Sequence, residues 1–528
     1  MPVILLIINV PVPLKLGGGV LGGVYGLWMN LTDEILLARQ RVYGIGDRTP
    51  LEVIGTETGN GALWVKREDL SPIRAYKWRG AFNKMAKLSE EERSRGVVAA
   101  SAGNHAQGVA LGAARLGIKA RIFMPVPTPR LKQEAVRRHG GEAVEIILTG
   151  DTFHEAAEAA ERQVREFGQI MIHPFDDLDV IAGQGTIADE IILSGKGPFD
   201  VVFLQIGGGG MAAGVSFWLK KFFPDIRVIG VEGVDQASMK LALDGGEVKP
   251  LEYVDVFCDG TAVREAGKLT YDICSETLDE IVTVTNEEVC AGIEFLWNKL
   301  RVIPETSGAM GVAAWLKDRK RFENLSSLSI LCGANMDFAR LGWIVRHAGI
   351  GSARRVYYRF TILEVPGTLF RLLELVRSKA NIIEFQYGKE GPSQAYPVIG
   401  FDADGANLSE LQRELNASGI AYLDVTGQPE VEFRIIPWNP TIMESPVFME
   451  VEFPERAGAL SDFLNSFYRD VNICYFSYQY SGERVGRAMI GFEIVDSAVR
   501  GDIENWKKKV PLGLRALKLV DLPGIGSC

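Results

Sequence analysis

Histidine and cysteine are scarce in this 528-residue chain, which has five histidines and six cysteines. The cysteines form no CxxC pair and the histidines no HExxH motif. The sequence therefore lacks the common zinc-ligand spacings and a disulfide framework, and it predicts no metal site. Scattered cysteines in so long a chain fit a reducing compartment. We expect a cytoplasmic protein, or a plastid protein if the source is eukaryotic.

Basic residues are outnumbered, with 57 Lys and Arg against 67 Asp and Glu and a formal charge of −10. Binding to nucleic acid or an anionic membrane needs a basic face, so we expect neither partner. The first 28 residues are apolar, but Pro11, Pro13 and a glycine run interrupt them, which does not suit a spanning helix. We interpret residues 1–31 as an N-terminal extension, with a natural start at Met29.

Glycine is abundant, at 58 of 528 residues, or about 11% against a usual ~7%. From residue 32 to residue 350 short β-branched runs alternate with amphipathic helical stretches, as in GVVAAS, NHAQGVALGAARLG and KARIFMP. This alternation is typical of parallel βαβ units whose sheets are covered on both faces. The sequence predicts an α/β catalytic domain over residues 32–350.

The pattern then changes to strand, helix, strand, strand, helix, strand, and it occurs twice. The second copy follows the first at an offset of 91 residues, with these matched pairs: Gly367 and Gly458, Leu369 and Leu460, Asn381 and Asn472, Ile382 and Ile473, Phe385 and Phe476, Tyr387 and Tyr478. Matches in one register indicate a duplicated ferredoxin-like βαββαβ unit. We assign residues 351–426 to the first α+β unit and 427–528 to a linker and the second unit.

Lys77 lies in the segment VKREDLSPIRAYKWRGAFNKM, before a short turn and a helix expected from Arg79 onward. A Schiff-base lysine needs a partly desolvated site near a cofactor phosphate and a rigid helix start that directs it. The same segment contains several basic residues and also fits a solvated basic face. The spacing alone leaves both interpretations open.

The segment SAGNHAQG, residues 101–108, directly follows a predicted strand. Its small residues let a ligand approach the backbone, and the Asn104 amide can donate to a phenolate or carboxylate oxygen. N–H groups at the helix start can hold a substrate carboxylate, which makes Ser101, Gly103 and His105 candidates. The alternative is a turn whose polar side chains only cap the helix.

Four consecutive glycines, in GGGGM at residues 207–211, separate a predicted strand from a helix. Unhindered amides at a helix N-terminus form a phosphate cradle. The spacing of Gly207, Gly209 and Ala212 also fits G-x-G-x-x-A, and Glu232 lies where a ribose-binding acid would be. This segment alone therefore also predicts a dinucleotide-dependent oxidoreductase.

Cys332 lies in ILCGAN, at the end of an apolar strand. A thiol at this point can hydrogen-bond a neutral pyridine nitrogen. The alternative is a buried structural cysteine, which is the usual state of a free one.

The order KREDLSPIRAYK, SAGNHAQG, GGGGM, ETSGA, CGAN resembles the pyridoxal-phosphate enzymes of the tryptophan-synthase β-like fold. More closely, it resembles the biosynthetic threonine dehydratases (threonine ammonia-lyases), including their tandem ACT-like regulatory tail. The resemblance covers about residues 32–496. It implies pyridoxal 5'-phosphate as cofactor and fold type II, with two parallel-sheet, three-layer subdomains, and it argues against the dinucleotide interpretation.

The resemblance also implies roles for individual residues. Lys77 matches the lysine that bonds covalently to the cofactor and moves the substrate Cα proton, and Asn104 matches the asparagine that holds the ring hydroxyl oxygen. Cys332 stands where the family usually has serine at the pyridine nitrogen. The phosphate loop corresponds to Gly207, Gly208, Gly209, Gly210 and Met211, with Met211 where leucine is more usual.

The activity implied is conversion of L-threonine, with L-serine as a second substrate, to a 2-oxoacid and ammonia, as the first step of isoleucine biosynthesis. Isoleucine is the implied inhibitor and valine a second effector, with Tyr387 and Tyr478 as candidate binding residues, in a homotetramer. Ala102 stands where related serine racemases have serine, which disfavours racemisation. The alternatives are a serine/threonine dehydratase with another effector, an oxidoreductase and a silent amino-acid sensor.

Overall fold

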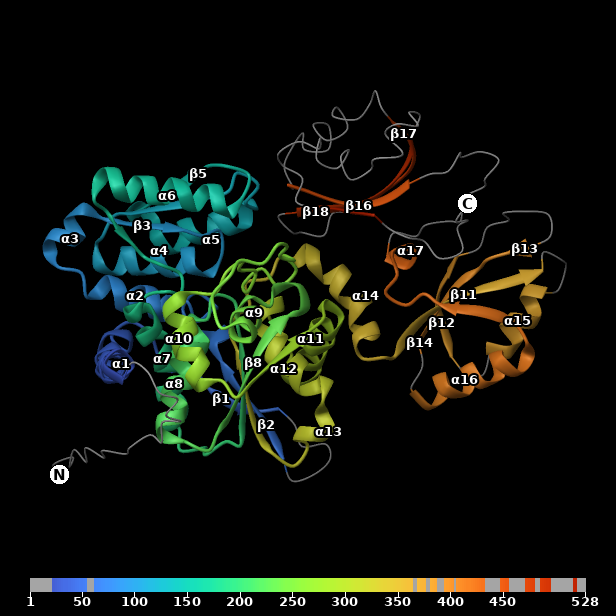
Figure 1. Cartoon of the computed structure of the whole chain (residues 1–528), viewed down its shortest axis with the longest axis horizontal. Coiled ribbons are helices and arrows are strands. Elements are labelled where there is room, and N and C mark those ends of the chain that lie inside the picture. The colour runs from blue at the N-terminus through green and yellow to red at the C-terminus, as the bar shows by residue number, and fades with distance from the viewer. Residues whose placement is uncertain are drawn as a thin grey trace. The chain divides into compact units, whose positions relative to one another are not determined.

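The structure, a computed structural model, consists of two compact units, residues 1–336 and 337–528, which are described separately (Figure 1). It describes residues 21–54, 61–363, 368–376, 380–386, 394–402, 405–432, 447–454, 471–479, 485–494 and 516–519. The unit boundary precedes helix α14 (Leu341–Gly351), within which the predicted boundary at residue 350 falls.

The first unit contains a six-stranded sheet, the large sheet, with the order β1-β2-β10-β7-β8-β9. Only β1 is antiparallel to its neighbour in this sheet. Its strands are β1 (Leu51–Val53), β2 (Ala62–Arg67), β7 (Val201–Gln205), β8 (Arg227–Gly233), β9 (Glu280–Val284) and β10 (Ser326–Leu331).

A second, four-stranded sheet of the same unit, the small sheet, has the order β5-β4-β3-β6 and is parallel throughout. Its strands are β3 (Val97–Ala100), β4 (Ala120–Met124), β5 (Val144–Leu148) and β6 (Ile170–Met171). Helices cover both sheets (Figure 1). The predicted α/β architecture with two parallel sheets is therefore confirmed.

The helices of the first unit connect these strands. They are α1 (Leu21–Val42), α2 (Trp78–Ala86), α3 (Glu90–Arg95), α4 (Asn104–Leu116), α5 (Arg130–Gly140), α6 (Phe153–Phe167), α7 (Leu178–Leu193), α8 (Gly210–Phe222), α9 (Ser238–Gly245), α10 (Lys268–Thr277), α11 (Asn286–Leu300), α12 (Thr306–Lys317) and α13 (Arg319–Phe322), with 3-10 helices η1 (Glu68–Leu70), η2 (Gly141–Ala143) and η3 (Val234–Gln236). Helix α1 runs through Met29 and past the predicted boundary at residue 31, and its Leu31 and Ile35 are fully buried.

Local sequence signals set several helix boundaries. Thr152 begins α6 with a capping box, because its hydroxyl accepts from the Glu155 N–H while the Glu155 carboxylate accepts from the Thr152 N–H. Gly168 ends the same helix in the left-handed conformation that glycine adopts without steric cost. These signals fix where helices start and stop, and packing decides where they lie.

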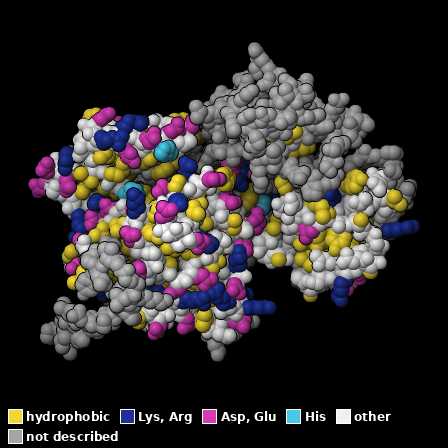
Figure 2. All heavy atoms as spheres, in the orientation of Figure 1, with side chains coloured by type: hydrophobic (Ala, Val, Ile, Leu, Met, Phe, Trp, Pro, Cys, Tyr) yellow, Lys and Arg dark blue, Asp and Glu magenta, His cyan; other side chains and the backbone are white. Residues whose placement is uncertain are grey.

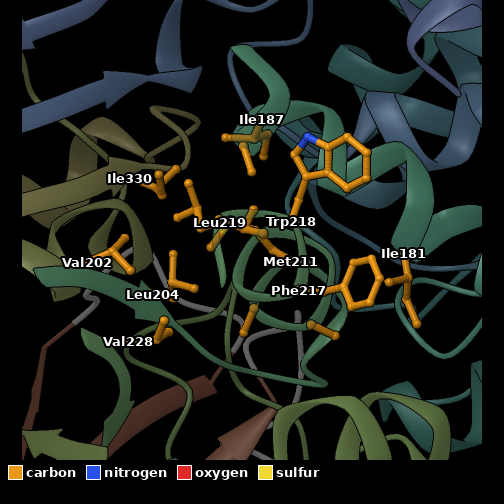
Figure 3. Close-up of a cluster of buried hydrophobic side chains, with 14 of the residues drawn as sticks. Ile181, Ile187, Val202, Leu204, Met211, Phe217, Trp218, Leu219, Val228 and Ile330 are labelled. Atoms are coloured by element: carbon orange, nitrogen blue, oxygen red, sulfur yellow. The ribbon is translucent and has the colours of Figure 1, made fainter. Parts of the chain in front are cut away.

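The core of the first unit lies between the large sheet and the helices α7 and α8. Figure 3 shows side chains of α8, including Met211 and Trp218, packed among residues of α7 and of the sheet. Leu204 of β7 and Ile330 of β10 are fully buried there. Because α8 starts at Gly210, the last residue of the glycine run, this core anchors the glycine loop.

The second unit contains two antiparallel sheets. Its elements are η4 (Phe338–Arg340), α14, β11 (Arg355–Leu363), α15 (Thr368–Val376), β12 (Asn381–Gln386), β13 (Gln394–Ala395), β14 (Val398–Asp402), α16 (Gly405–Ser418), β15 (Ala421–Asp424), α17 (Pro429–Glu432), β16 (Val447–Pro454), β17 (Val471–Gln479), β18 (Val485–Ile494) and β19 (Ala516–Leu519). In the first sheet β14 lies between β12 and β11, and β15 pairs with β11. The second sheet has the equivalent order β17-β18-β16-β19.

The two sheets of the second unit share an irregularity. The pairing of β12 with β14 shifts register between Ile382 and Glu384, and that of β17 with β18 shifts between Ile473 and Tyr475. These positions are 91 residues apart, the same offset as the sequence repeat. A β-bulge repeated at one offset supports duplication of a single structural unit.

The visible surface of the described residues carries Lys and Arg interspersed with Asp and Glu (Figure 2). None of the helices in the described part of the chain is both long and apolar enough to cross a membrane.

Candidate active site

Lys77 immediately precedes α2, in a segment held against the end of β10. The Tyr76 N–H donates to the carbonyl of Cys332 at 3.1 Å, and Ala75 forms an isolated bridge with Gly333. The Lys77 ammonium donates to the Pro174 carbonyl at 2.9 Å. Burial lowers the pKa of Lys77 to about 8, although Cys332 and Glu305 oppose the shift. This lysine is therefore partly neutral at physiological pH.

The backbone at Lys77 is also held by a close approach of α4. A Cβ added to Gly108 would lie 3.0 Å from the Trp78 nitrogen and 3.1 Å from the Lys77 carbonyl carbon. Only glycine permits this distance between α2 and α4. The position of Lys77 is consequently set by backbone packing as well as by its side chain.

The glycine loop links β7 to α8, with Gly209 at φ +95° and the helix beginning at Gly210. N–H groups in the first turn of a helix have no acceptor within that helix, and the helix dipole adds positive potential there. Phe175 supports the loop, because a Cβ at Gly208 would lie 2.3 Å from its ring atoms. The Thr270 hydroxyl donates to the Gly208 carbonyl at 2.6 Å. This arrangement is suited to binding an anion.

The turn Ser101–Gly103 connects β3 to α4. The Gly103 N–H donates to the Ser101 hydroxyl at 3.2 Å, and the Ser101 N–H donates to the Phe123 carbonyl at 3.1 Å. A Cβ at Gly103 would meet no atom within 4 Å, so the turn borders open space. That space leaves room for a ligand beside the turn.

Asn104, Glu305 and Asn335 form a hydrogen-bonded group beside this turn. The side-chain nitrogen of Asn104 lies 2.8 and 3.0 Å from the two Glu305 carboxylate oxygens. The side-chain nitrogen of Asn335 donates to the side-chain oxygen of Asn104 at 2.8 Å. Burial raises the pKa of Glu305 to about 7. Glu305 and Asn335 were not among the residues predicted from the sequence, although the motifs ETSGA and CGAN contain them.

His105 is 3% exposed and its Nε2 lies 2.7 Å from the Ile172 carbonyl oxygen. Burial lowers its pKa to about 3, with the Lys77 charge adding to the shift. The imidazole is therefore neutral at physiological pH.

Cys332 lies immediately after β10 and is also 3% exposed. Burial, together with the Glu305 charge, raises the pKa of its thiol well above the usual value. The thiol stays protonated and can act only as a weak, neutral hydrogen-bond donor.

Glu232 caps a helix. Its carboxylate accepts from the N–H groups of Met239 and Lys240 at 2.9 and 2.8 Å, at the start of α9. Burial raises the pKa of Glu232 to about 7. Glu232, whose spacing from the glycine run suggested a ribose-binding acid, therefore has a structural role in the fold.

Tyr387 lies outside the described residues. Tyr478 belongs to β17, where it pairs with Ala488, and its side chain is outside the described part of the structure. The candidate effector turns at Pro366–Gly367 and Ala457–Gly458 also fall outside it.

Comparison with protein families gives two matches. Residues 43–333 match the model described as "Pyridoxal-phosphate dependent enzyme". Residues 346–434 and 443–515 match the "C-terminal regulatory domain of Threonine dehydratase".

Individual relatives are similar over most of their length. The chain is 38% identical over 470 residues to the L-threonine dehydratase biosynthetic IlvA of Burkholderia multivorans, covering 87% of this chain and 92% of that protein. It is 34% identical to the chloroplastic biosynthetic threonine dehydratase of Arabidopsis thaliana, covering 89% and 79%. The chain belongs to the biosynthetic threonine dehydratase family.

A solved relative in this family is the processed form of threonine deaminase isoform 2 from Solanum lycopersicum. It superposes with a TM-score of 0.59 at 40% identity, covering 63% of this chain and 95% of that one. Membership of the family establishes fold type II and dependence on pyridoxal phosphate, and the dinucleotide alternative is wrong.

The residues present fit this cofactor. Pyridoxal phosphate requires an anion site, an amine for its aldehyde and polar partners for its ring. The glycine loop offers the anion site and Lys77 offers the amine. The segment Pro174–Phe175 contacts both the loop and the lysine. Cys332, Asn104 and Glu305 supply polar atoms for the ring, and Cys332 and Glu305 lie close enough to the lysine to affect its pKa.

Proposed function

We propose that this chain converts L-threonine to 2-oxobutanoate and ammonia, the first step of isoleucine biosynthesis, and accepts L-serine as a second substrate. The observation that carries the proposal is the Lys77 amine, whose pKa is lowered to about 8 beside an anion-binding glycine loop. An amine that is partly neutral at physiological pH is suited both to covalent bonding with an aldehyde and to proton transfer.

Binding of the cofactor is divided among three elements. The N–H groups of the loop Gly207–Gly210 and of Met211 would hold the phosphate at the start of α8. Asn104, which is oriented by its bond to Glu305, would donate to the ring hydroxyl oxygen. Cys332 would face the pyridine nitrogen with a protonated thiol.

Pyridoxal phosphate, when bound, supplies a conjugated ring that withdraws electrons from the substrate Cα and makes its proton acidic. Lys77 would take up the substrate Cα proton at Nζ. Cys332 would keep its own proton and offer the pyridine nitrogen no full positive charge. As a partner for the ring it would therefore be weaker than a charged group.

Ser101, Gly103 and His105 are proposed to hold the substrate carboxylate. The support is the open space at Gly103 and the start of α4 at Asn104. His105, neutral and bonded to the Ile172 carbonyl, orients the turn. No proton transfer is assigned to it.

The regulatory unit is proposed to bind isoleucine as inhibitor, with valine as a second effector, through Tyr387 and Tyr478. The assembly is proposed to be a homotetramer in the cytoplasm, or in a plastid in a eukaryote. The duplicated sheets with their shared bulge support two equivalent effector sites.

A threonine-dependent ketoacid assay on the purified protein tests the activity. We expect 2-oxobutanoate and ammonia in equal amounts, and visible absorbance that borohydride bleaches. Absorbance without turnover of threonine or serine would favour the silent-sensor alternative. Turnover of serine alone would contradict the proposed substrate.

The effector proposal is tested with Tyr387→Ala and Tyr478→Ala. Coupling between sites is typically 1–3 kcal/mol, so the isoleucine inhibition curve is expected to shift by roughly 5- to 150-fold, with activity in its absence nearly unchanged. Tyr396→Ala, in the same unit and hydrogen-bonded to Gln394, is the matched control. Unchanged inhibition in both test variants would place the effector site elsewhere.

A further inference from the structure

Four charged side chains are buried together beneath the start of α2. They are Lys66 of β2, Glu68 of η1, Arg79 of α2 and Glu190 of α7, and each side chain is at most 2% exposed. We refer to them as the buried ion cluster. Two positive and two negative charges make it neutral overall.

Arg79 is the centre of the cluster. Its Nε and Nη2 donate to the two Glu68 carboxylate oxygens at 2.8 and 2.9 Å, and its Nη1 donates to Glu190 at 2.6 Å. This planar fork matches a carboxylate in a way that a lysine cannot. Arg79 therefore ties α2 both to the segment after β2 and to α7.

Lys66 completes the arrangement. Its ammonium lies 2.5 Å from the Glu190 carboxylate and 3.6 Å from that of Glu68. Burial would raise the pKa of Glu68, but attraction to Arg79 and Lys66 outweighs it and holds that pKa below the usual value. Glu68 is consequently charged at physiological pH.

Stability is a poor explanation for such a cluster. Desolvation of buried ions often cancels their attraction, and well-packed apolar side chains of similar volume are frequently as stable or more so. A directional network does, however, specify a single arrangement of the elements that it joins.

Lys77 lies beside the point where the cluster joins α2 to α7 and to the segment after β2. It precedes Arg79 by two residues, the Arg79 N–H donates to the Tyr76 carbonyl at 3.1 Å, and the Ala81 N–H donates to the Lys77 carbonyl at 3.3 Å. Helix α7 also approaches α2 closely, because a Cβ at Gly183 would lie 2.6 Å from the Gly80 Cα. Any tilt or slide of α2 against α7 therefore moves the lysine.

We propose that the buried ion cluster is a positioning device for Lys77, fixing the start of α2 so that the amine meets the cofactor aldehyde and the substrate Cα. The inference rests on the proposed function of Lys77. The four side chains bond to one another and to Thr49 and Thr186, and they act on Lys77 through the backbone of α2. Misplacing a reacting group by 1 Å can reduce a rate by roughly 100-fold.

Two variants of the full-length holoenzyme test the proposal. Arg79→Lys keeps the charge and loses the fork. The quadruple variant Lys66→Met/Glu68→Leu/Arg79→Met/Glu190→Leu replaces the whole cluster by apolar side chains. Arg67→Lys is the matched control, because Arg67 also forms a fork with a carboxylate, Asp69, but its other bond goes to Glu52 rather than to α2 or α7.

We expect Arg79→Lys to retain its melting temperature to within a few degrees, whereas kcat per bound cofactor falls by roughly 10- to 100-fold with little change in KM. The visible circular dichroism of the cofactor, which reports how it is held, should change in parallel. The quadruple variant, if folded, should show the same losses with unreduced thermal stability. Arg67→Lys should match the wild type in both readouts.

Wild-type kcat and circular dichroism in Arg79→Lys would overturn the proposal. So would equal losses in Arg67→Lys, which would indicate a general effect on stability. If the quadruple variant does not fold, Arg79→Lys decides the question. If the wild type binds the cofactor but does not turn over threonine, the proposed function fails, and the circular dichroism still reports on positioning.

Discussion

The large and small sheets of the first unit contribute different chemistry to the same site. The large sheet carries the glycine loop after β7 and Cys332 after β10, and the lysine segment lies against its end. The small sheet contributes the turn Ser101–Gly103 and Asn104, all uncharged. In the proposed site the large sheet would thus provide the covalent and anionic contacts, and the small sheet would provide uncharged groups that orient the ligand.

Burial lowers the pKa of a basic group on the large-sheet side and of another on the small-sheet side, with different results. It lowers the pKa of Lys77 to about 8 and that of His105 to about 3. The first value lies where an amine can exchange protons at physiological pH, and the second leaves the histidine neutral at that pH. We therefore expect the reactive group on the large-sheet side.

The largest effect is expected from Lys77→Ala. Loss of a general base alone costs roughly 10²- to 10⁴-fold, and loss of the covalent amine adds to that. We expect no borohydride-sensitive absorbance of the wild-type kind and dehydration reduced by more than about 100-fold. Lys84→Ala, in the same helix but paired with Asp177 and Asp179, is the control and should stay active. Substantial threonine turnover by Lys77→Ala would show that another lysine reacts.

Asn104→Ala is expected to have an intermediate effect. A hydrogen bond to a charged group contributes about 1.5–3 kcal/mol, which corresponds to roughly 10- to 150-fold in cofactor affinity. Equilibrium dialysis of pyridoxal phosphate measures the change. Asn286→Ala, which removes an amide that also donates to a carboxylate, that of Asp255, is the matched control. Equal affinities for the two variants would remove Asn104 from the cofactor site.

The pH dependence of cofactor capture is a smaller effect that distinguishes the two sides. The pKa of Lys77 is lowered, so its neutral, reactive fraction grows as pH rises and becomes the majority above about 8. The rate at which the cofactor-free protein acquires absorbance should rise from pH 6.5, reach half its limit near pH 8 and level off above about pH 9. A rate unchanged over that interval would mean that deprotonation of Lys77 does not limit capture.

The smallest effect on dehydration is expected from Ala102→Ser. Ala102 is 3% exposed in the turn on the small-sheet side. A hydroxyl there adds a proton carrier on the face of Cα opposite to Lys77, so some racemisation of serine should appear while dehydration is largely kept. Chiral chromatography of recovered serine measures it, with Ala102→Gly as control. Racemisation by the wild type itself would contradict the single-base argument.

Local patterns made much of the fold predictable. The alternation of strands and helices gave the parallel sheets, the offset of 91 gave the duplication, and the glycine run marked the start of α8. Each of these signals lies within a short stretch of chain. The helix start at Trp78, one residue before the expected Arg79, shows how small such errors are.

Long-range pairs were not predictable. Asn104 and Glu305 are 201 residues apart in the sequence, and Lys66 and Glu190 are 124 apart. No periodicity connects such residues, because their contact depends on how helices pack on the sheets. For the same reason Glu232 suggested a nucleotide site from its spacing, whereas the fold uses its carboxylate to cap α9.

The bulge shared by the two regulatory sheets has a consequence for protein engineering. Side chains alternate between faces along a strand, and a bulge shifts that alternation by one residue. Deleting the extra residue, Ile383 in β12 or Cys474 in β17, would make the pairing regular and leave each residue beyond it opposite the same partner, and therefore on the same face. Deleting one residue elsewhere in either strand would instead exchange the faces of everything beyond the deletion. The bulge thus marks a position at which each strand tolerates a one-residue deletion.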